Sequence, residues 1–197
     1  GVFLTSPSSD NIPHGKSACL VFGECGGCQY QDISYEEELR LKETALKEVL
    51  AASFPVERWP FHPVVPSPKA YHYRNRLDLK LARGRDGTLR VGFSPSEGPV
   101  IEVESCPIAM ERVSAFIPTL RREASAGLPK GYRMANLTVR CGDGPDVCWG
   151  GIGRRSLRLF AHDYFFTDIS GKRIFYSLDT FFQANLSILP KLFERIR

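Results

Sequence analysis

The sequence predicts an α+β fold in which a mainly antiparallel sheet is flanked by helices. Short alternating apolar segments follow one another through tight turns, which is typical of hairpins and not of alternating βαβ units. Amphipathic segments with helical spacing stand before and after them. With 197 residues, 43% of them hydrophobic, the chain can build a packed core. It has no apolar run of about 18 residues, so we expect no membrane partner.

The first expected element is a helix over residues 34–52. Ser34 is a good N-cap and Glu37 follows three positions later, which together make a capping box. The apolar residues of this segment recur at helical spacing and define one stripe, made of Tyr35, Leu39, Leu46, Val49 and Leu50. Five prolines interrupt residues 54–68, so we expect a connection without regular structure there.

Alternating apolar and polar residues predict three strands after this connection. In segment 76–81 the leucines share one face and the charged residues share the other. The turn at 84–87 leads to a second strand over 88–93, which predicts a hairpin. Ile101 and Val103 alternate with Glu102 and Glu104, which predicts a third strand that ends at Cys106-Pro107.

The same patterns predict the remaining elements. A helix is expected from about Met110 to Ala126, kinked or divided at Pro118 because proline lacks the N–H that a helix interior needs. Strand-like segments lie at 136–140, 147–149, 157–161 and 174–176. A final helix is expected over 185–197, with Asn185 as its N-cap.

The charge of the chain is unevenly distributed. The net charge is +4, but residues 69–90 carry seven basic and two acidic side chains (7 − 2 = +5), and residues 112–158 carry nine and three (9 − 3 = +6). Basic blocks of this size hold polyanions such as nucleic acid, although solvated faces balanced by nearby acids produce the same pattern.

Three cysteines stand close together in the sequence, at positions 19, 25 and 28, and Gly26 and Gly27 let the chain fold tightly between two of them. Cys106 is the best candidate for a fourth ligand, because it ends a strand and precedes a proline. A triplet with one distant thiolate favours a [4Fe–4S] cluster, with a zinc site or unligated buried thiols as alternatives. Cys141 and Cys148 are interpreted as small buried hydrophobes.

Several motifs together resemble the RNA (uracil-5-)-methyltransferase family. The segment C-L-V-F-G-E-C-G-G-C-Q at 19–29 resembles its iron–sulfur motif, and Cys106-Pro107-Ile108 resembles the segment that carries the fourth ligand. The segment Y-R-N-R at 73–76 is similar to a strand entry of the family, and F-Q-A-N at 182–185 is similar to its F-x-Q-x-N.

This resemblance implies a parent enzyme that transfers a methyl group from S-adenosylmethionine to C5 of a uridine in rRNA or tRNA. It implies that Cys19, Cys25, Cys28 and Cys106 hold a [4Fe–4S] cluster and that Gln183 lies at the S-adenosylmethionine site. No residue of this chain matches the catalytic nucleophile or base, so we expect the fragment itself to be inactive.

The resemblance also implies a division of the chain. Residues 1–18 are expected to be a tail or linker from a missing N-terminal domain, 19–184 an iron–sulfur and RNA-binding central domain, and 185–197 the truncated start of the methyltransferase domain. The catalytic Rossmann-like domain is expected to be missing from this chain, and the resemblance allows helix 34–52 to pack against it. We expect a cytoplasmic location.

Two groups of arginines are candidates for RNA contact. The first lies on or near the predicted hairpin, and the second lies beside a glycine-rich turn. The candidates are Arg74, Arg76, Arg83, Arg85, Arg90, Arg154, Arg155 and Arg158. Pairing of the hairpin arginines with Glu102 and Glu104 across the sheet is the rival interpretation. A zinc-stabilised, non-catalytic nucleic-acid-binding module and a small iron–sulfur electron carrier remain alternative functions.

Overall fold

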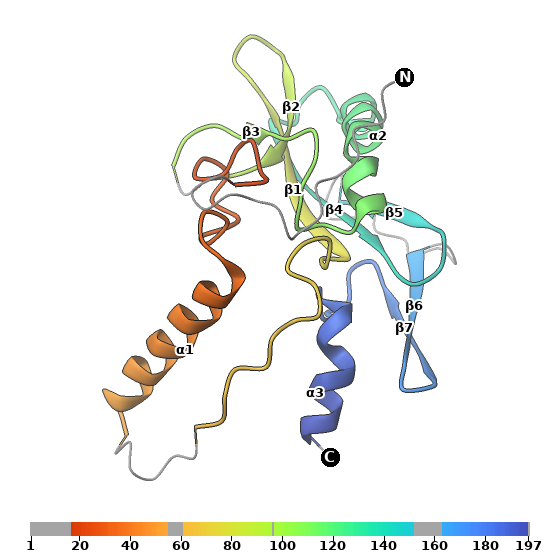
Figure 1. Ribbon diagram of the computed structural model, residues 1–197. Helices are drawn as coiled ribbons and strands as arrows, with labels where there is room; N and C mark the ends of the chain where they lie inside the picture. The colour runs from red at the N-terminus through yellow and green to blue at the C-terminus, as the bar shows by residue number, and fades with distance from the viewer. Residues whose placement is uncertain (1–16, 55–60, 96, 152–162, 197) are drawn as a thin grey trace.

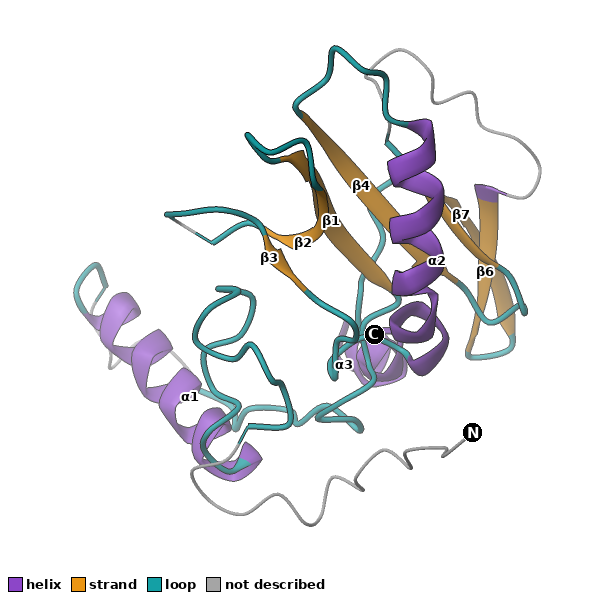
Figure 2. Ribbon diagram, turned by 90° about the horizontal axis from the view of Figure 1, so that it is seen from above, coloured by secondary structure: helices purple, strands orange, loops and turns teal. Residues whose placement is uncertain are grey.

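The computed structural model describes residues 17–54, 61–95, 97–151 and 163–196. A five-stranded sheet with the order β3-β2-β1-β4-β5 forms its centre, and helix α2 covers one face of this sheet (Figures 1 and 2). Every neighbouring pair of strands in it is antiparallel. The strands are β1 (Arg76–Arg83), β2 (Leu89–Phe93), β3 (Ile101–Glu102), β4 (Met134–Cys141) and β5 (Val147–Gly150). The predicted α+β class is confirmed.

The main core lies between this sheet and helix α2 (Glu111–Gly127). Leu77, Leu79 and Leu81 of β1 are fully buried there, in the same cluster as Ile117 and Leu120 of α2. Side chains alternate between the two faces of a strand, so the polar residues of β1 lie on the opposite, open face of the sheet. The predicted alternation in this hairpin is confirmed.

Of the two alternatives predicted at Pro118, a kink or a division, the division is wrong, because helix α2 continues through this residue. Proline removes one backbone hydrogen bond from a helix interior. Here Ile117 and Leu120 on either side of it are fully buried against the sheet, and their burial outweighs the lost hydrogen bond.

Helix α1 (Tyr35–Ala51) begins as predicted. Ser34 is the N-cap, and its Oγ accepts a hydrogen bond from the backbone N–H of Glu37 at 3.2 Å. None of its residues is buried, and the helix extends away from the sheet (Figure 1). The first residue of α1, Tyr35, contacts the proline-rich connection over 54–68. Its hydroxyl oxygen accepts a hydrogen bond from the backbone N–H of Ser67 at 2.8 Å.

The C-terminal part begins with a second sheet, a hairpin of β6 (Tyr164–Ile169) and β7 (Lys172–Ser177). The predicted strand at 174–176 is part of β7. Strand β6 was not expected, because its two adjacent phenylalanines obscure the alternation. The strand expected at 157–161 lies outside the described residues.

The last element is a short 3-10 turn, η4 (Leu186–Ile188), followed by helix α3 (Leu189–Ile196). The side chain of Asn185 caps it by accepting from the backbone N–H of Ser187, as predicted. In the described part of the chain, no helix is both long and apolar enough to cross a membrane.

Candidate functional site

The four cysteines singled out in the sequence line one small cavity of about 30 Å³. Cys19, Cys25 and Cys28 reach it from one compact loop, and Cys106 reaches it from the segment after β3. The loop is closed by turns, in which Glu24 and Cys25 both donate backbone hydrogen bonds to the carbonyl of Val21 at 3.1 Å. The fold therefore brings together residues that are almost 80 positions apart in the sequence.

Backbone features fix the conformation of the loop and the position of Cys106 separately. Gly26 has a φ of 71°, which glycine adopts without the cost that a β-carbon would bring. Cys106 is buried, and its backbone N–H donates to Oγ of Ser114 in α2 at 2.9 Å. The fourth thiol thus sits on the rigid core, whereas the other three lie on a loop packed beside it.

The thiols are electrostatically linked. Burial raises the pKa of the Cys106 thiol to about 11, and the neighbouring Cys28 and Cys19 contribute to the rise. Burial likewise raises the pKa of Cys19 and of Cys28. The uncharged thiol is therefore the favoured form of these three. In the described residues, no group of three or more Cys, His, Asp or Glu lies close enough together to hold a metal ion, so the thiols share a cavity without metal-ligand geometry.

Besides the cysteines, three polar residues line the same cavity, Gln31, Arg74 and Ser105. Oε1 of Gln31 accepts a hydrogen bond from Oγ of Ser17 at 2.8 Å, whereas its Nε2 is buried and has no hydrogen-bond partner. The side chain of Gln31 and, to a smaller extent, the positive charge of Arg74 act to lower the pKa of Cys28, against the effect of burial. Gln31 was not among the residues predicted from the sequence, although it lies only three residues after the triplet.

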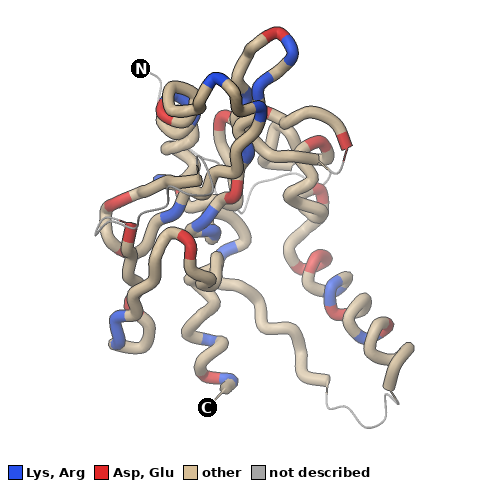
Figure 3. Tube along the Cα trace, turned by 180° about the vertical axis from the view of Figure 1, so that it is seen from behind, with Lys and Arg blue, Asp and Glu red and all other residues tan. Residues whose placement is uncertain are grey.

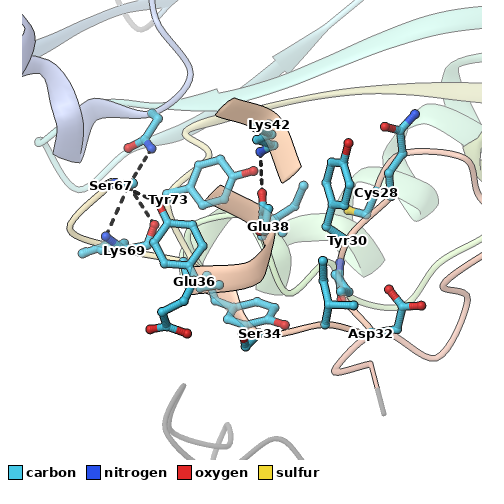
Figure 4. A pocket seen from close by; sticks show the side chains of 18 of the residues that line it. Cys28, Tyr30, Asp32, Ser34, Glu36, Glu38, Lys42, Ser67, Lys69 and Tyr73 are labelled. Carbon is cyan, nitrogen blue, oxygen red and sulfur yellow. Dashed lines mark hydrogen bonds and ion pairs between the residues drawn. The ribbon is translucent and has the colours of Figure 1, made fainter. Parts of the chain in front are cut away.

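A larger, open cleft of about 910 Å³ adjoins this cavity and shares Cys28 with it. Figure 4 shows that Tyr30 and Tyr73 reach into it from different segments, and that Lys42 of α1 pairs with Glu38 at its wall. On the far side Asn185 donates from Nδ2 to Oγ of Ser67 at 2.9 Å. The cleft therefore lies between α1, the proline-rich connection over 54–68 and Asn185, which precedes η4.

The predicted hairpin arginines do not form one patch. Arg74 lines the thiol cavity. Arg76 and Arg90 lie on the open face of the sheet, since Arg90 is opposite Ala82 in the register and both alternate with buried residues. Arg83 alternates onto the face that α2 covers, where its Nε donates to the carbonyl of Tyr132 at 3.4 Å.

The remaining predicted arginines fall into two cases. Arg85 is exposed in the turn between β1 and β2, where Figure 3 shows basic and acidic residues side by side. Arg154, Arg155 and Arg158 lie outside the described residues.

The rival interpretation of the hairpin arginines is wrong in its choice of partner. The ion pairs of Glu102 and Glu104 are made with Arg121 of α2, at 3.7 and 2.6 Å. Arg76 pairs instead with Asp78 on its own strand at 2.7 Å. The two strand glutamates therefore neutralise a helix arginine and not the hairpin.

Gln183 lies in the segment between β7 and η4, and its residue is exposed. The carbonyls on either side of it, of Phe182 and Ala184, accept hydrogen bonds from Arg140 and from the backbone N–H of Asn75. Arg140, a fully buried arginine in β4, was not among the residues predicted from the sequence. The sequence gives no signal of its burial, because Asn136, Thr138 and Arg140 alternate with apolar residues like the outward-facing positions of an ordinary strand.

No protein-family profile matches the chain. It is 36% identical over 120 residues to an uncharacterized RNA methyltransferase of Aquifex aeolicus, a match that covers 61% of this chain and 26% of that relative. It is also 36% identical over 108 residues to the tRNA (uracil(54)-C(5))-methyltransferase of Pyrococcus abyssi, over 50% of this chain and 24% of the relative. The chain thus spans about a quarter of the length of the curated relatives that it matches.

The fold has a solved counterpart as well. The crystal structure of the Pyrococcus abyssi tRNA (uracil-54, C5)-methyltransferase in complex with S-adenosyl-L-homocysteine matches with a TM-score of 0.59 and 19% identity, over 86% of this chain and 50% of that one. The fold and the matched sequence make this chain a homologue of part of the RNA methyltransferases, which confirms the resemblance seen in the motifs. Among these relatives, the tRNA (uracil(54)-C(5))-methyltransferase of Pyrococcus abyssi is similar to it in both sequence and fold.

Proposed function

We propose that this chain is the cluster-bearing and RNA-binding part of an S-adenosylmethionine-dependent enzyme that forms 5-methyluridine in tRNA or rRNA. Two features of the chain support this proposal together. The matched relatives are named as RNA methyltransferases, and the four cysteines of the sequence motif line one cavity. We propose a cytoplasmic site of action, because thiols that serve as cluster ligands must stay reduced and a reducing compartment keeps them so.

In the proposed reaction, a cysteine thiolate adds to C6 of uracil, which makes C5 nucleophilic toward the methyl group of S-adenosylmethionine. A base then removes the C5 proton and the thiolate is eliminated. We assign both groups to a catalytic domain of the parent enzyme beyond this chain. We assign to this chain the role of holding the RNA, whose target base must leave its stack to react.

The residues around the thiol cavity suit an iron–sulfur cluster by their chemistry. Four thiols are the ligand set of such a cluster, and the buried Nε2 of Gln31 is a donor without an acceptor beside them. When bound, a cluster supplies a cross-link between the loop at 19–28 and the core-mounted Cys106. Loop movement that brings the thiols to one centre is part of this proposal, since their present arrangement is not that of a metal site.

Reconstitution under anaerobic conditions with iron and sulfide tests the cluster. We expect broad absorbance near 400 nm and about four irons per chain. Cys28→Ser should abolish this, whereas Cys148→Ser is the matched control, since Cys148 does not line the cavity. Stoichiometric zinc in the purified protein, with no iron uptake, would instead support the zinc-stabilised module.

For RNA we propose contact by the arginines of the hairpin. The triple variant Arg83→Ala, Arg85→Ala, Arg90→Ala should weaken binding similarly across RNA sequences, because each phosphate contact adds roughly 0.7 to the salt slope for single strands. The single variant Arg83→Ala distinguishes between the two faces of the sheet as the RNA-binding face. If it changes the RNA affinity only slightly, the RNA binds on the open face, beside Arg90. Arg173→Ala on β7 is the control, since it removes an exposed arginine that lies outside the hairpin. Unchanged affinity and slope in the triple variant would exclude the hairpin.

We further propose that Gln183 contacts S-adenosylmethionine in the parent enzyme and that α1 packs against the catalytic domain. The exposed position of Gln183 and the uncovered apolar stripe of α1 support these two assignments. Purified chain of 197 residues should not methylate RNA, and methyl transfer by it would contradict the proposed boundaries.

A further inference from the structure

The segment that carries Gln183 is held to the sheet by a single buried guanidinium. Nη1 of Arg140 donates to the carbonyls of Ser177 and Thr180, at 2.8 and 2.7 Å. Its Nη2 donates to the carbonyl of Phe182 at 3.2 Å. One side chain from β4 thus holds three carbonyls of the turn after β7, the last of them next to Gln183.

Aromatic packing reinforces this contact. The guanidinium carbon of Arg140 lies 4.7 Å from the ring centroid of Tyr176. The Tyr176 ring in turn stacks on that of Phe182, with centroids 4.2 Å apart and planes 8° apart. The residue before Gln183 is therefore held through both its carbonyl and its side chain.

The backbone after Gln183 is held by Asn75, which precedes β1 and is fully buried. Its backbone N–H donates to the carbonyl of Ala184 at 2.9 Å, and its Nδ2 donates to the Tyr176 hydroxyl at 3.2 Å. Both neighbours of Gln183 are thus fixed to strands of the main sheet, whereas Gln183 itself is exposed.

Filling the buried space around Arg140 does not by itself require a charged side chain. Arg140 is completely buried, it makes no salt bridge within the described residues, and its Nε lacks a hydrogen-bond partner. Burial of a cation without a carboxylate is costly, and it lowers the pKa of Arg140. An apolar residue of similar volume would avoid this cost but would leave the carbonyls of Thr180 and Phe182 without this donor, and that of Ser177 with the Thr180 hydroxyl. The arrangement is therefore suited to fixing a loop.

We propose that Arg140 and Asn75 are positioning residues that preset the backbone of Gln183 for contact with S-adenosylmethionine. This inference rests on the proposed function of Gln183. Binding then costs less conformational entropy, because the loop is already ordered before the ligand arrives. Arg140 touches neither cofactor nor RNA in this proposal and acts only through the loop.

The first test needs only the 197-residue chain. Hydrogen exchange of the Asn75 amide reports the bond to the Ala184 carbonyl. In Arg140→Lys, which keeps the charge but has a single donor group, we expect exchange of this amide to accelerate about tenfold, the effect of losing hydrogen bonds from a charged group. The exchange rates of the β1 and β4 amides should change by less than about twofold. An unchanged exchange rate of the Asn75 amide would show that Arg140 does not hold the segment that carries Gln183. Arg140→Met serves as a second variant.

The second test uses the full-length enzyme and a double-mutant cycle with Gln183→Ala. Arg140→Lys should weaken S-adenosylmethionine binding about fivefold in the parent background and less than about twofold once Gln183 is removed, since coupled residues are not additive. RNA affinity should stay unchanged. Additive losses, or equal losses of both ligands, would overturn a positioning role in favour of general destabilisation. If Gln183→Ala alone leaves the affinity for S-adenosylmethionine unchanged, the proposed cofactor role of Gln183 is wrong, and so is the positioning role of Arg140 and Asn75. The hydrogen-exchange result still shows separately whether Arg140 holds the segment that carries Gln183.

Discussion

Helices α1 and α2 have the same length, 17 residues, and both are amphipathic, yet only one of them is part of the core. Helix α2 buries five residues against the sheet, among them Ile117 and Leu120. Helix α1 buries none, and its apolar side chains Leu46 and Val49 remain 53% and 67% exposed. The contrast is visible in Figure 1, where α1 points away from the sheet.

This contrast shows that an apolar stripe indicates a helix that needs a partner, without indicating where the partner is. Helices of this length are marginal in isolation, and most of their stability comes from packing. Helix α2 obtains that stability from β1 and β4 within the chain. Helix α1 depends on the N-cap Ser34 and on ion pairs between neighbouring turns, such as Glu37 with Arg40. The two helices should therefore respond differently to substitution.

The largest effect is expected in α2. Ile117→Ala removes a fully buried side chain and leaves a cavity, so the free energy of unfolding of the chain should fall by about 3 kcal/mol. Urea unfolding followed by circular dichroism measures this. A loss below about 1 kcal/mol would show that the α2–sheet interface collapses around the gap and is not tightly packed.

The next effect is local to α1. Ser34→Ala removes the side-chain acceptor for the Glu37 amide and should destabilise the helix by about 1 kcal/mol. Because no residue of α1 is buried, we expect α1 to unfold separately from the core, and faster hydrogen exchange should be confined to the α1 amides. A matching decrease in the stability of the sheet would show that α1 and the core unfold together.

A smaller effect is expected for the apolar stripe. Leu46→Ala should change the stability of this chain by no more than about 0.5 kcal/mol, because an exposed leucine makes few contacts. In a full-length enzyme in which α1 packs against another domain, the same change should cost about 2 kcal/mol or more. Equal small effects in both proteins would exclude packing of this stripe against the rest of the enzyme.

The smallest effect concerns pH. Hydrogen bonds from Arg40 lower the pKa of the Glu37 carboxyl, and a hydrogen bond from Lys47 lowers that of Glu43. A carboxyl whose pKa is lower in the helix than in the unfolded chain stabilises the helix at neutral pH, and this contribution is lost as the pH falls through the folded-state pKa. Helical Cα chemical shifts of α1 should decrease slightly below about pH 4. Arg40→Gln should reduce the part of this change that comes from Glu37.

The sequence by itself determined the local structure and the chemistry-bearing residues. Alternation of leucines placed β1 and its buried face, Ser34 and Asn185 were recognised as caps, and the cysteine motifs indicated the relatives, because each of these signals lies within a few neighbouring positions. Pro118 misled the prediction, because its local cost is visible in the sequence and the burial that outweighs it is not.

Only the tertiary structure decided which distant residues meet. It placed Cys106 beside the loop at 19–28, directed Glu102 to Arg121 instead of to the hairpin, and distributed the hairpin arginines over two faces and a cavity. It also revealed Arg140 as the support of the Gln183 segment. The physical reason is the same in each case: these contacts join segments tens of residues apart, and their energies depend on burial and on precise donor–acceptor distances that only the packed chain creates.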